Sequence, residues 1–268
     1  MSDFIVGNDI SKHQGDVDFE VYKKNSNFLI IKATEGVGYT DPKFSRNQSE
    51  SRRIGLPLGY YHFARPDLKN SAEAEANWFI KTLGQLRDGE FLVLDYEANW
   101  GGNVVSWCKT FLDTIKAINN CKPLVYLNQA LITGKNWQPV VDAGYGLWVA
   151  AYTYDPTKNT FKLGAWKFAA MQQWTNKQIV PGIVGPVDGN VFFGSVITLK
   201  KYGYRSPEPE LTPLELKNLE IQKLNKAITT LQTTHANELA QVKTDCQKVL
   251  QVIKGDALKI VEKCDEGI

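Results

Sequence analysis

Two acidic residues, Asp95 and Glu97, end an apolar stretch that starts at Phe91. Such a run of apolar and β-branched residues is typical of a buried strand that emerges into a site. Because side chains alternate along a strand, both acids are expected on the same side, with roughly 6–7 Å between successive same-face positions. Neighbouring carboxylates repel and burial penalises their charge, so one should keep its proton near neutral pH. This suits a general acid beside an anion; the alternative is a strand end with two solvated acids.

Seven further short apolar runs are separated from one another by turn-forming residues. The eight expected strands lie at residues 4–9, 28–33, 57–63, 91–97, 123–128, 146–152, 168–174 and 186–192. Apolar residues at helical spacing predict helices over residues 71–86 and 104–118. Strands that alternate with helices pair in parallel, and eight of them favour an α/β fold whose sheet closes into a TIM-like β/α barrel.

The last part of this barrel is expected to be irregular. The links between the last three strands contain Asp155-Pro156, Asn159-Thr160, Pro181-Gly182 and Gly185-Pro186. These residue types suit turns and hairpins rather than helices. We therefore expect a barrel whose final helices are missing, in a domain of about 200 residues, the low end for this architecture.

Polar residues are expected at the C-terminal end of each of the eight runs. They are Asn8, Asp9, Ser11, Lys32, Thr34, Glu35, His62, Arg65, Asp95, Glu97, Tyr126, Asn128, Tyr152, Gln172, Gln173, Trp174, Asp188 and Asn190. In a β/α barrel the carboxyl ends of the strands form one rim, which carries the active site. Each residue also has an ordinary structural interpretation: Asp9 or Ser11 could cap a helix, and His62 could be a satisfied core histidine. Eight strand ends in succession nevertheless favour a site at the rim.

Attack on a glycosidic bond is the chemistry that this rim suits. Such hydrolysis needs a carboxylic acid to protonate the leaving oxygen and a second group to stabilise the positive charge that develops on the sugar. The acidic candidates are Asp9, Asp95, Glu97 and Asp188. Aromatic side chains can stack on sugar rings while their polar tips bond hydroxyls. The aromatic candidates are Tyr61, Tyr126, Trp148, Tyr152 and Trp174. A phosphate site is disfavoured, because no glycine-rich loop of the required spacing follows a strand.

Composition excludes several other classes of protein. With 268 residues, 43% of them hydrophobic and 22% charged, the chain can bury one large core and a small accessory segment. A net charge of +2 argues against a nucleic-acid binder, and no apolar stretch is long enough to cross a bilayer. Four cysteines and three histidines are not spaced like a zinc site, so free thiols are expected.

The composition changes after Tyr204. All aromatic residues, which are 7 Trp, 11 Tyr and 12 Phe, lie at or before this position. The segment that follows is rich in proline, which blocks helix and sheet and favours an extended spacer. We therefore expect a barrel domain at residues 1–204, a Pro-rich linker at 205–213 and a separate tail at 214–268.

Apolar residues in the tail recur at spacings of three and four. They are Ile221, Leu224, Ile228, Leu231, Leu239, Val242, Cys246, Val249, Ile253, Ala257, Ile260 and Cys264, with His235 at a seam position flanked by four-residue steps. This pattern predicts a coiled coil, and a helix of roughly fifty residues would extend about 75 Å. So long an amphipathic helix should bury its apolar stripe against something else. Homo-oligomerisation is favoured over docking onto another assembly, cell-wall attachment or folding back onto the barrel.

Eight motifs resemble the muramidases of glycoside hydrolase family 25. They are DISKHQG (9–15), IIKATEG (30–36), GYYHFARP (59–66), LVLDYE (92–97), VYLN (125–128), LWVAAY (147–152), MQQW (171–174) and VDGN (187–190). The resemblance implies that the partner is bacterial peptidoglycan, lysed by cutting the β-1,4 bond between N-acetylmuramic acid and N-acetylglucosamine. It implies an acidic cluster of Asp9, Asp95, Glu97 and Asp188. It also places Tyr61, Tyr126, Gln173 and Trp174 near the sugar, and the rim adds Arg65, Trp148 and Tyr152 to the expected substrate contacts.

The resemblance places Glu97 at the position of the general acid. In this interpretation Glu97 protonates the leaving oxygen and later accepts a proton from water, while Asp95 sets its pKa by like-charge coupling. The resemblance is also compatible with attack by the substrate's own N-acetyl carbonyl, oriented by Asp188 or Asp95. This chemistry needs no metal and no cofactor.

A lysozyme with an extra C-terminal segment suggests a phage endolysin. The N-terminal sequence has neither the basic start nor the apolar run of a secretory signal. We therefore expect a protein that is made in the host cytoplasm and acts at the bacterial cell wall, without inserting into a membrane. Two alternatives are a hydrolase of another N-acetylhexosamine polymer such as chitin, and an inactive barrel kept as a wall-binding or virion component. The intact pair of Asp95 and Glu97 argues against the inactive version.

Overall fold

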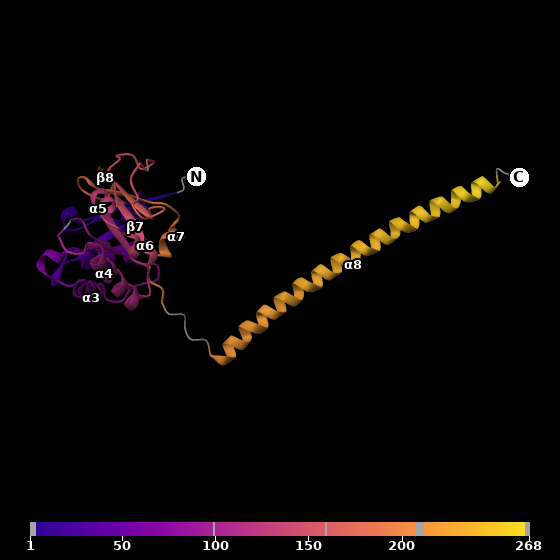
Figure 1. Ribbon diagram of the computed structural model, residues 1–268, viewed down its shortest axis with the longest axis horizontal. Helices are drawn as coiled ribbons and strands as arrows, with labels where there is room; N and C mark the ends of the chain where they lie inside the picture. Colours follow the sequence, from indigo (N-terminus) through magenta and orange to yellow (C-terminus); the bar gives the residue numbers. More distant parts are fainter. Residues whose placement is uncertain (1–3, 99, 159, 207–211, 266–268) are drawn as a thin grey trace. The chain divides into compact units, whose positions relative to one another are not determined.

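The computed structural model describes residues 4–98, 100–158, 160–206 and 212–265. The chain forms two compact units, residues 1–206 and 207–268. The first unit is an α/β barrel, and the second is built on one long helix, α8 (Pro213–Asp265) (Figure 1).

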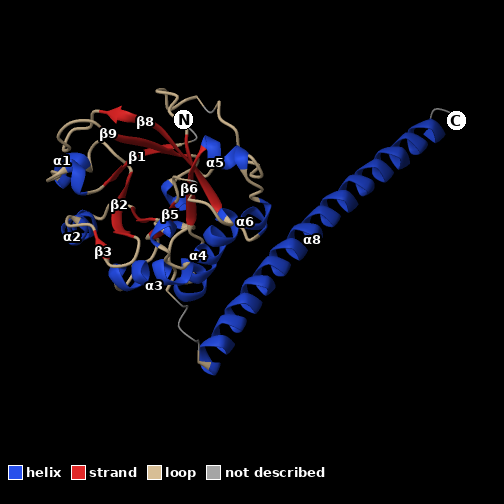
Figure 2. Ribbon diagram, turned by 60° about the vertical axis from the view of Figure 1, so that its left-hand side comes forward, coloured by secondary structure: helices blue, strands red, loops and turns tan. Residues whose placement is uncertain are grey.

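Eight strands close into the barrel, which Figure 2 shows nearly end-on. They are β1 (Ile5–Ile10), β2 (Phe28–Glu35), β4 (Leu58–Phe63), β5 (Phe91–Asp95), β6 (Leu124–Asn128), β7 (Gly146–Ala150), β8 (Met171–Gln178) and β9 (Val187–Phe192). The ring closes because β1 pairs with both β2 and β9. A short strand, β3 (Tyr39–Thr40), forms an antiparallel pair with β2. The eight predicted strands correspond to these eight, so the predicted closed barrel is confirmed.

The last strand of the ring runs against the others. β9 is antiparallel to both β1 and β8, whereas the remaining neighbours in the ring are parallel. The expectation that Asp188 lies at the carboxyl end of the last run is therefore wrong, because it is the second residue of β9. The reversed direction brings the start of β9 to the rim where the parallel strands end. Asp188 reaches the rim for this reason.

Helices cover the barrel along its first two thirds, and one short helix follows its last strand. They are α1 (Phe19–Tyr22), α2 (Phe44–Ile54), α3 (Ala72–Leu83), α4 (Val104–Asn119), α5 (Gln129–Gly134), α6 (Gln138–Asp142) and α7 (Val196–Lys200), with 3-10 turns at η1 (Lys12–Gln14) and η2 (Pro66–Leu68). The two helices predicted from the sequence are α3 and α4. Between β7 and β9 the described residues form no helix. The expected loss of the final helices is thereby confirmed.

Large and small side chains alternate inside the barrel. Phe91 and Val93 of β5 face the interior, whereas Leu92 and Leu94 belong to the core between the strands and the helices. On the neighbouring strand β4, a Cβ atom added to Gly59 would lie 2.4 Å from the Phe91 ring. The absence of a side chain at Gly59 therefore leaves space for this ring. Since alternation continues along β5, the next interior-facing residue after Val93 is Asp95.

The tail unit consists of an unbroken helix of 53 residues. Its described seam residues are exposed; Leu224 and Leu231, for example, are 57% and 68% exposed. No helix of the described chain is both long and apolar enough to cross a membrane. The long C-terminal helix is confirmed, and the coiled coil remains a prediction.

Candidate active site

A pocket of about 180 Å³ lies at the rim where the parallel strands end. The described residues that line it are Asp9, Ser11, His13, Lys32, Tyr61, Phe63, Asp95, Glu97, Tyr126, Trp148, Tyr152, Gln173 and Asp188. The structure therefore brings together all four predicted acids and five of the seven predicted substrate contacts. The remaining two, Arg65 and Trp174, are not among the lining residues.

Strand register explains why these side chains meet. Asp95 of β5 lies in register with Tyr126 of β6, and Tyr126 in turn lies in register with Trp148 of β7. On the opposite side of the ring, Asp9 of β1 pairs with Asp188 of β9. Residues far apart in the sequence therefore reach one pocket because the closed sheet places them at the same level.

Two amide side chains hold the carboxylate of Asp9, which is 8% exposed. Gln173 Nε2 and Asn190 Nδ2 both donate to Asp9 Oδ2, at 2.9 and 2.7 Å. Burial raises the pKa of Asp9, and these two hydrogen bonds oppose the rise because they stabilise the charged form. Asp9 is thus a buried acid in a site built to accept its negative charge.

Three aromatic side chains fix the orientation of these amides. The hydroxyls of Tyr126 and Tyr152 donate to Gln173 Oε1, at 2.8 and 2.9 Å. Trp148 Nε1 donates to Asn190 Oδ1 at 3.1 Å. Since each amide oxygen accepts from an aromatic donor, each amide nitrogen is left to face the carboxylate. The aromatic residues of the pocket therefore also position its acids.

Asp95 is buried, and its Oδ1 atom has no hydrogen-bond partner among the described residues. Burial raises the pKa of Asp95 well above its usual range, and the charges of Glu97 and Asp9 raise it further. Lys32 opposes this rise. A buried carboxyl group that faces other acids keeps its proton at neutral pH.

Glu97 is more exposed to solvent than Asp95 and lines the pocket. Its backbone carbonyl accepts a hydrogen bond from Asn128 Nδ2 at 2.6 Å. The Asn128 Oδ1 atom in turn caps α5 by accepting from the Leu131 N–H at 3.0 Å. Partial burial raises the pKa of the Glu97 carboxyl group, and the charge of Asp9 raises it further.

Asp188 completes the acidic cluster. Burial, followed by the charges of Asp9 and Glu97, raises the pKa of Asp188 to about 7. All four carboxyl groups therefore have raised pKa values, and their titrations depend on one another. The charge of Glu97 raises the pKa of Asp95 and that of Asp9 raises the pKa of Glu97, so the expected tuning of Glu97 by Asp95 remains a prediction.

Comparison with known proteins identifies the family. The model of the family described as "Glycosyl hydrolases family 25" matches residues 8–183. The chain belongs to glycosyl hydrolase family 25. An N,O-diacetylmuramidase from Chalaropsis sp. is 30% identical to this hydrolase over 213 residues, which cover 74% of this chain and 98% of the relative.

Solved structures agree with the assignment to family 25. A bacterial lysozyme from Streptomyces coelicolor has 28% sequence identity and a TM-score of 0.62, and the match covers 73% of this chain and 95% of that chain. The catalytic domain of the endolysin ply40 from bacteriophage P40 of Listeria monocytogenes has 27% identity and a TM-score of 0.58, covering 74% of this chain and 98% of that one. The matched part in this hydrolase corresponds in length to the barrel.

Lys32 lines the pocket of this family 25 hydrolase; it was predicted at the rim but was given no role in catalysis or binding. Its ammonium group pairs with Glu35 at 2.8 Å and lies 4.9 Å from the centre of the Phe63 ring. Its positive charge lowers the pKa of Asp95 and of Glu97. The signal that could have assigned Lys32 a role is its place inside an otherwise apolar run. Ser11, also predicted at the rim, lines the pocket, and His13 and Phe63 line it without having been predicted to do so.

Two residues predicted to contact substrate lie elsewhere. The guanidinium group of Arg65 pairs with Glu35 and Asp67, at 2.8 Å each. Arg65 lines a neighbouring cavity of about 370 Å³, because it follows the end of β4 and precedes the turn η2. Trp174 follows Gln173 on β8, so strand alternation directs its side chain away from the interior position that Gln173 occupies.

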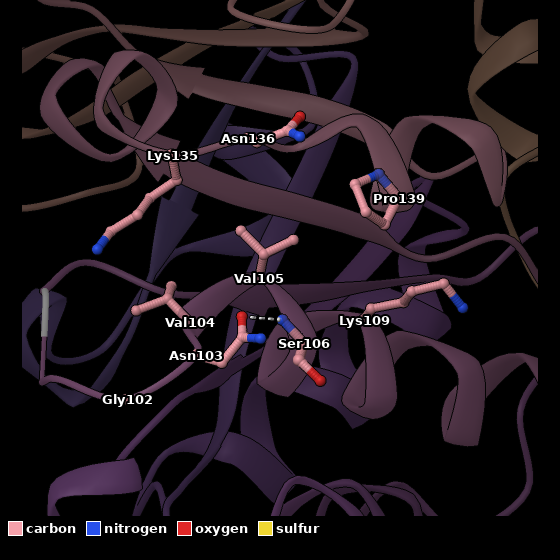
Figure 3. A pocket seen from close by; sticks show the side chains of 9 residues that line it. All are labelled: Gly102, Asn103, Val104, Val105, Ser106, Lys109, Lys135, Asn136 and Pro139. Carbon is pink, nitrogen blue, oxygen red and sulfur yellow. Dashed lines mark hydrogen bonds between the residues drawn. The ribbon is translucent and has the colours of Figure 1, made fainter.

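A larger hollow of about 710 Å³ lies on the flank of this hydrolase, between the start of α4 and the link from α5 to α6 (Figure 3). Asn103 Oδ1 caps α4 there by accepting from the Ser106 N–H at 3.1 Å. The charged side chains at this hollow are Lys109 and Lys135 (Figure 3), and none of its described lining residues is acidic. Acid-catalysed hydrolysis therefore fits the smaller pocket at the rim.

Proposed function

We propose that this family 25 hydrolase is a muramidase, which cuts peptidoglycan between N-acetylmuramic acid and N-acetylglucosamine. The observation that carries the proposal is a rim pocket in which Glu97, open to substrate, lies among buried acids that raise carboxyl pKa values. A similar protein from Chalaropsis sp. is named an N,O-diacetylmuramidase. The shared family, the shared fold and the acidic site support the bond between N-acetylmuramic acid and N-acetylglucosamine as the bond that this chain cuts.

In the proposed reaction Glu97 is the proton donor. Its partial exposure gives it access to a sugar bound at the rim, and a sugar that covers it removes water and raises its pKa further. Glu97 transfers its proton to the glycosidic oxygen as the bond between that oxygen and the anomeric carbon breaks. It later accepts a proton from the water that adds to the anomeric carbon.

The substrate's acetamido group is the proposed nucleophile. Its carbonyl oxygen attacks the anomeric carbon as the leaving oxygen departs, a recognised variant of the two-carboxylate scheme. Asp95 is the better placed of two candidates to orient this group. Its buried Oδ1 atom has no hydrogen-bond partner among the described residues, so it can accept a hydrogen bond from the acetamido N–H. Asp188 is the second candidate and lies in register with Asp9 at the same pocket.

The aromatic residues of the pocket take two different proposed roles. Tyr152 is 43% exposed, so its ring can stack on a sugar. Trp148 is 2% exposed, packs edge to face against Tyr126 and holds Asn190. Its proposed role is therefore to position the amide that holds Asp9.

The chemical identity of the new ends tests the proposed bond. Fragments released from purified peptidoglycan should carry N-acetylmuramic acid at their reducing ends, which mass analysis after borohydride reduction identifies. Reducing ends of N-acetylglucosamine would contradict the proposal. Release of sugars from chitin at a similar rate would favour the alternative substrate, and an inert chain would favour the inactive wall-binding component.

The site of action follows from the substrate. A muramidase acts at the bacterial cell wall, and one solved relative is the catalytic domain of a phage endolysin. We propose that this chain is likewise a phage endolysin, made in the host cytoplasm. The proposal rests on the likeness to that catalytic domain.

The helical tail has a proposed role in self-association. Its apolar seam is exposed along the described part of α8, so pairing with another copy would remove apolar surface from water. Sedimentation of the full chain should therefore give a mass above 30.1 kDa, whereas the barrel alone, residues 1–206, should sediment as a monomer. Two monomeric species would refute self-association.

A further inference from the structure

Helix α8 carries an apolar stripe whose spacing repeats. Starting from Ile221, the steps between seam positions are three, four, three, four and four residues, and the same steps start again at Leu239 and at Ala257. Each start lies 18 residues after the one before it. Eighteen residues make five turns of an α-helix. The stripe therefore stays on one side of a straight helix, where a second straight helix can follow it over its full length.

The residue types along the stripe favour a pair of helices. Ile221 and Ile228 occupy the first seam position of two successive heptads, and Leu224 and Leu231 occupy the second. All four are half-exposed or more, at 50–68%. Isoleucine at the first position with leucine at the second is the combination that favours two strands over three or four in parallel coiled coils. A second copy of the chain supplies this complementary surface.

Charges beside the stripe select the orientation of the two copies. Glu238 lies on one edge of the seam and Lys243 on the other, five residues later. In a parallel pair in register, the residue at the first edge faces the residue five positions later on the other helix. Glu238 of each copy then meets Lys243 of the other, twice per pair. An antiparallel pair brings like edges together and removes both contacts.

We propose that two copies of the chain pair through α8 in parallel and in register, with Cys246 of one copy against Cys246 of the other. This inference rests on the self-association proposed above. Helices that pack with axes 8–10 Å apart, each with its Cα atoms about 2.3 Å from the axis, bring facing Cα atoms to roughly 5 Å. A disulfide needs 4.4–6.8 Å between these atoms. Cys246 is free and exposed in the single chain.

Parallel pairing has a consequence for the enzyme. In both copies the Pro-rich linker enters α8 at its first residue, so both barrels are attached at the same end of the helix pair. Two muramidase sites on one assembly can engage the same stretch of cell wall, and binding of the first raises the effective concentration of the second. An antiparallel pair would attach the two barrels at opposite ends.

Oxidation by diamide tests the orientation. Two thiols lose two protons and two electrons as the S–S bond forms, and the N=N bond of diamide takes up both to become a hydrazine. Three variants of the full chain make the comparison. The first variant is Cys264→Ser, which keeps Cys246 at the seam. The other two carry both Cys246→Ser and Cys264→Ser. One of them adds Leu224→Cys at the seam, and the other adds Thr244→Cys away from the seam. The barrel thiols Cys108 and Cys121 are buried.

Both seam variants should run at twice the mass of the chain in denaturing, non-reducing gels, and reduction should reverse the shift. The Thr244→Cys control should remain a single chain under the same conditions. An antiparallel pair cannot link like residues at two seam positions this far apart, so linkage at one position alone would overturn the parallel register. Sedimentation separates the remaining outcomes: a dimer that links at neither position overturns the orientation alone, whereas a monomer overturns the self-association on which it rests.

Discussion

Replacing Glu97 with glutamine should abolish the clearing of purified cell walls. Glutamine keeps the size and the hydrogen-bonding shape of the side chain but cannot transfer a proton to the glycosidic oxygen. General acid catalysis contributes about 10²–10⁴-fold to a rate, so the rate of release of reducing ends should fall by about that factor. Turbidity of a wall suspension and reducing-end release measure the change.

The substitution should leave the fold intact, because Glu97 is partly exposed and anchored through its backbone. The hydrogen bond from Asn128 goes to its carbonyl oxygen, which glutamine retains. Thermal unfolding should therefore be unchanged within a few degrees. Glu73→Gln is a matched control, because Glu73 is an exposed glutamate in the first turn of α3. Full wall-clearing activity in Glu97→Gln would remove Glu97 from its proposed role.

A second substrate separates proton donation from binding. An aryl glycoside whose leaving group departs without protonation needs no general acid in its first step. Glu97→Gln should therefore cleave this substrate with a smaller loss of rate than it shows on the wall. An equal loss on both substrates would indicate that Glu97 holds the sugar and does not supply its proton.

Strand alternation was enough to predict the positions of most site residues. Asp95 and Tyr126 follow apolar runs whose period of two directs them into the barrel, and closure of the ring brings Asp9 near them. The same rule, applied within MQQW, separates Gln173 from Trp174. Gln173 lines the pocket, and the contact of Trp174 with substrate remains a prediction.

Other features of the site depend on pairings that no local pattern specifies. The direction of β9 is set by its partners β1 and β8, so Asp188 reached the rim for a reason the sequence did not show. The two hydrogen bonds on Asp9 join residues more than 160 positions apart. His62 was expected either at the rim or as a satisfied core histidine, and its complete burial supports the second interpretation.

Glu75→Ala should strongly destabilise the barrel, because it removes the acceptor of a buried network. Glu75 and His62 are both fully buried, and His62 Nε2 lies 2.8 Å from Glu75 Oε2. The Arg65 backbone N–H donates to the same oxygen at 3.0 Å, and Thr34 Oγ1 lies 2.7 Å from His62 Nδ1. Leaving the His62 ring and the Arg65 N–H without their acceptor costs about 1–3 kcal/mol for each group, and together this lowers Tm by roughly 4–24 °C in a domain of this size.

The loss should be larger in acid than in base, and the sign follows from His62. Burial lowers its pKa, whereas Glu75 raises it. Histidine in the unfolded chain takes up a proton below about pH 6.5, whereas buried His62 stays neutral. The stability that neutral His62 contributes is therefore complete above that pH. It is lost as the pH falls toward the pKa of His62 in the folded state. Without Glu75 the pKa of His62 in the folded state is lower still. The variant therefore keeps losing stability over a wider range as the pH falls. Calorimetry at pH 8 and pH 5 should show a wider gap in Tm between the parent and Glu75→Ala at pH 5. Glu73→Ala, exposed on the same helix, should change Tm little at either pH. An equal gap at both values would mean that Glu75 does not change the pKa of folded His62 in this pH range.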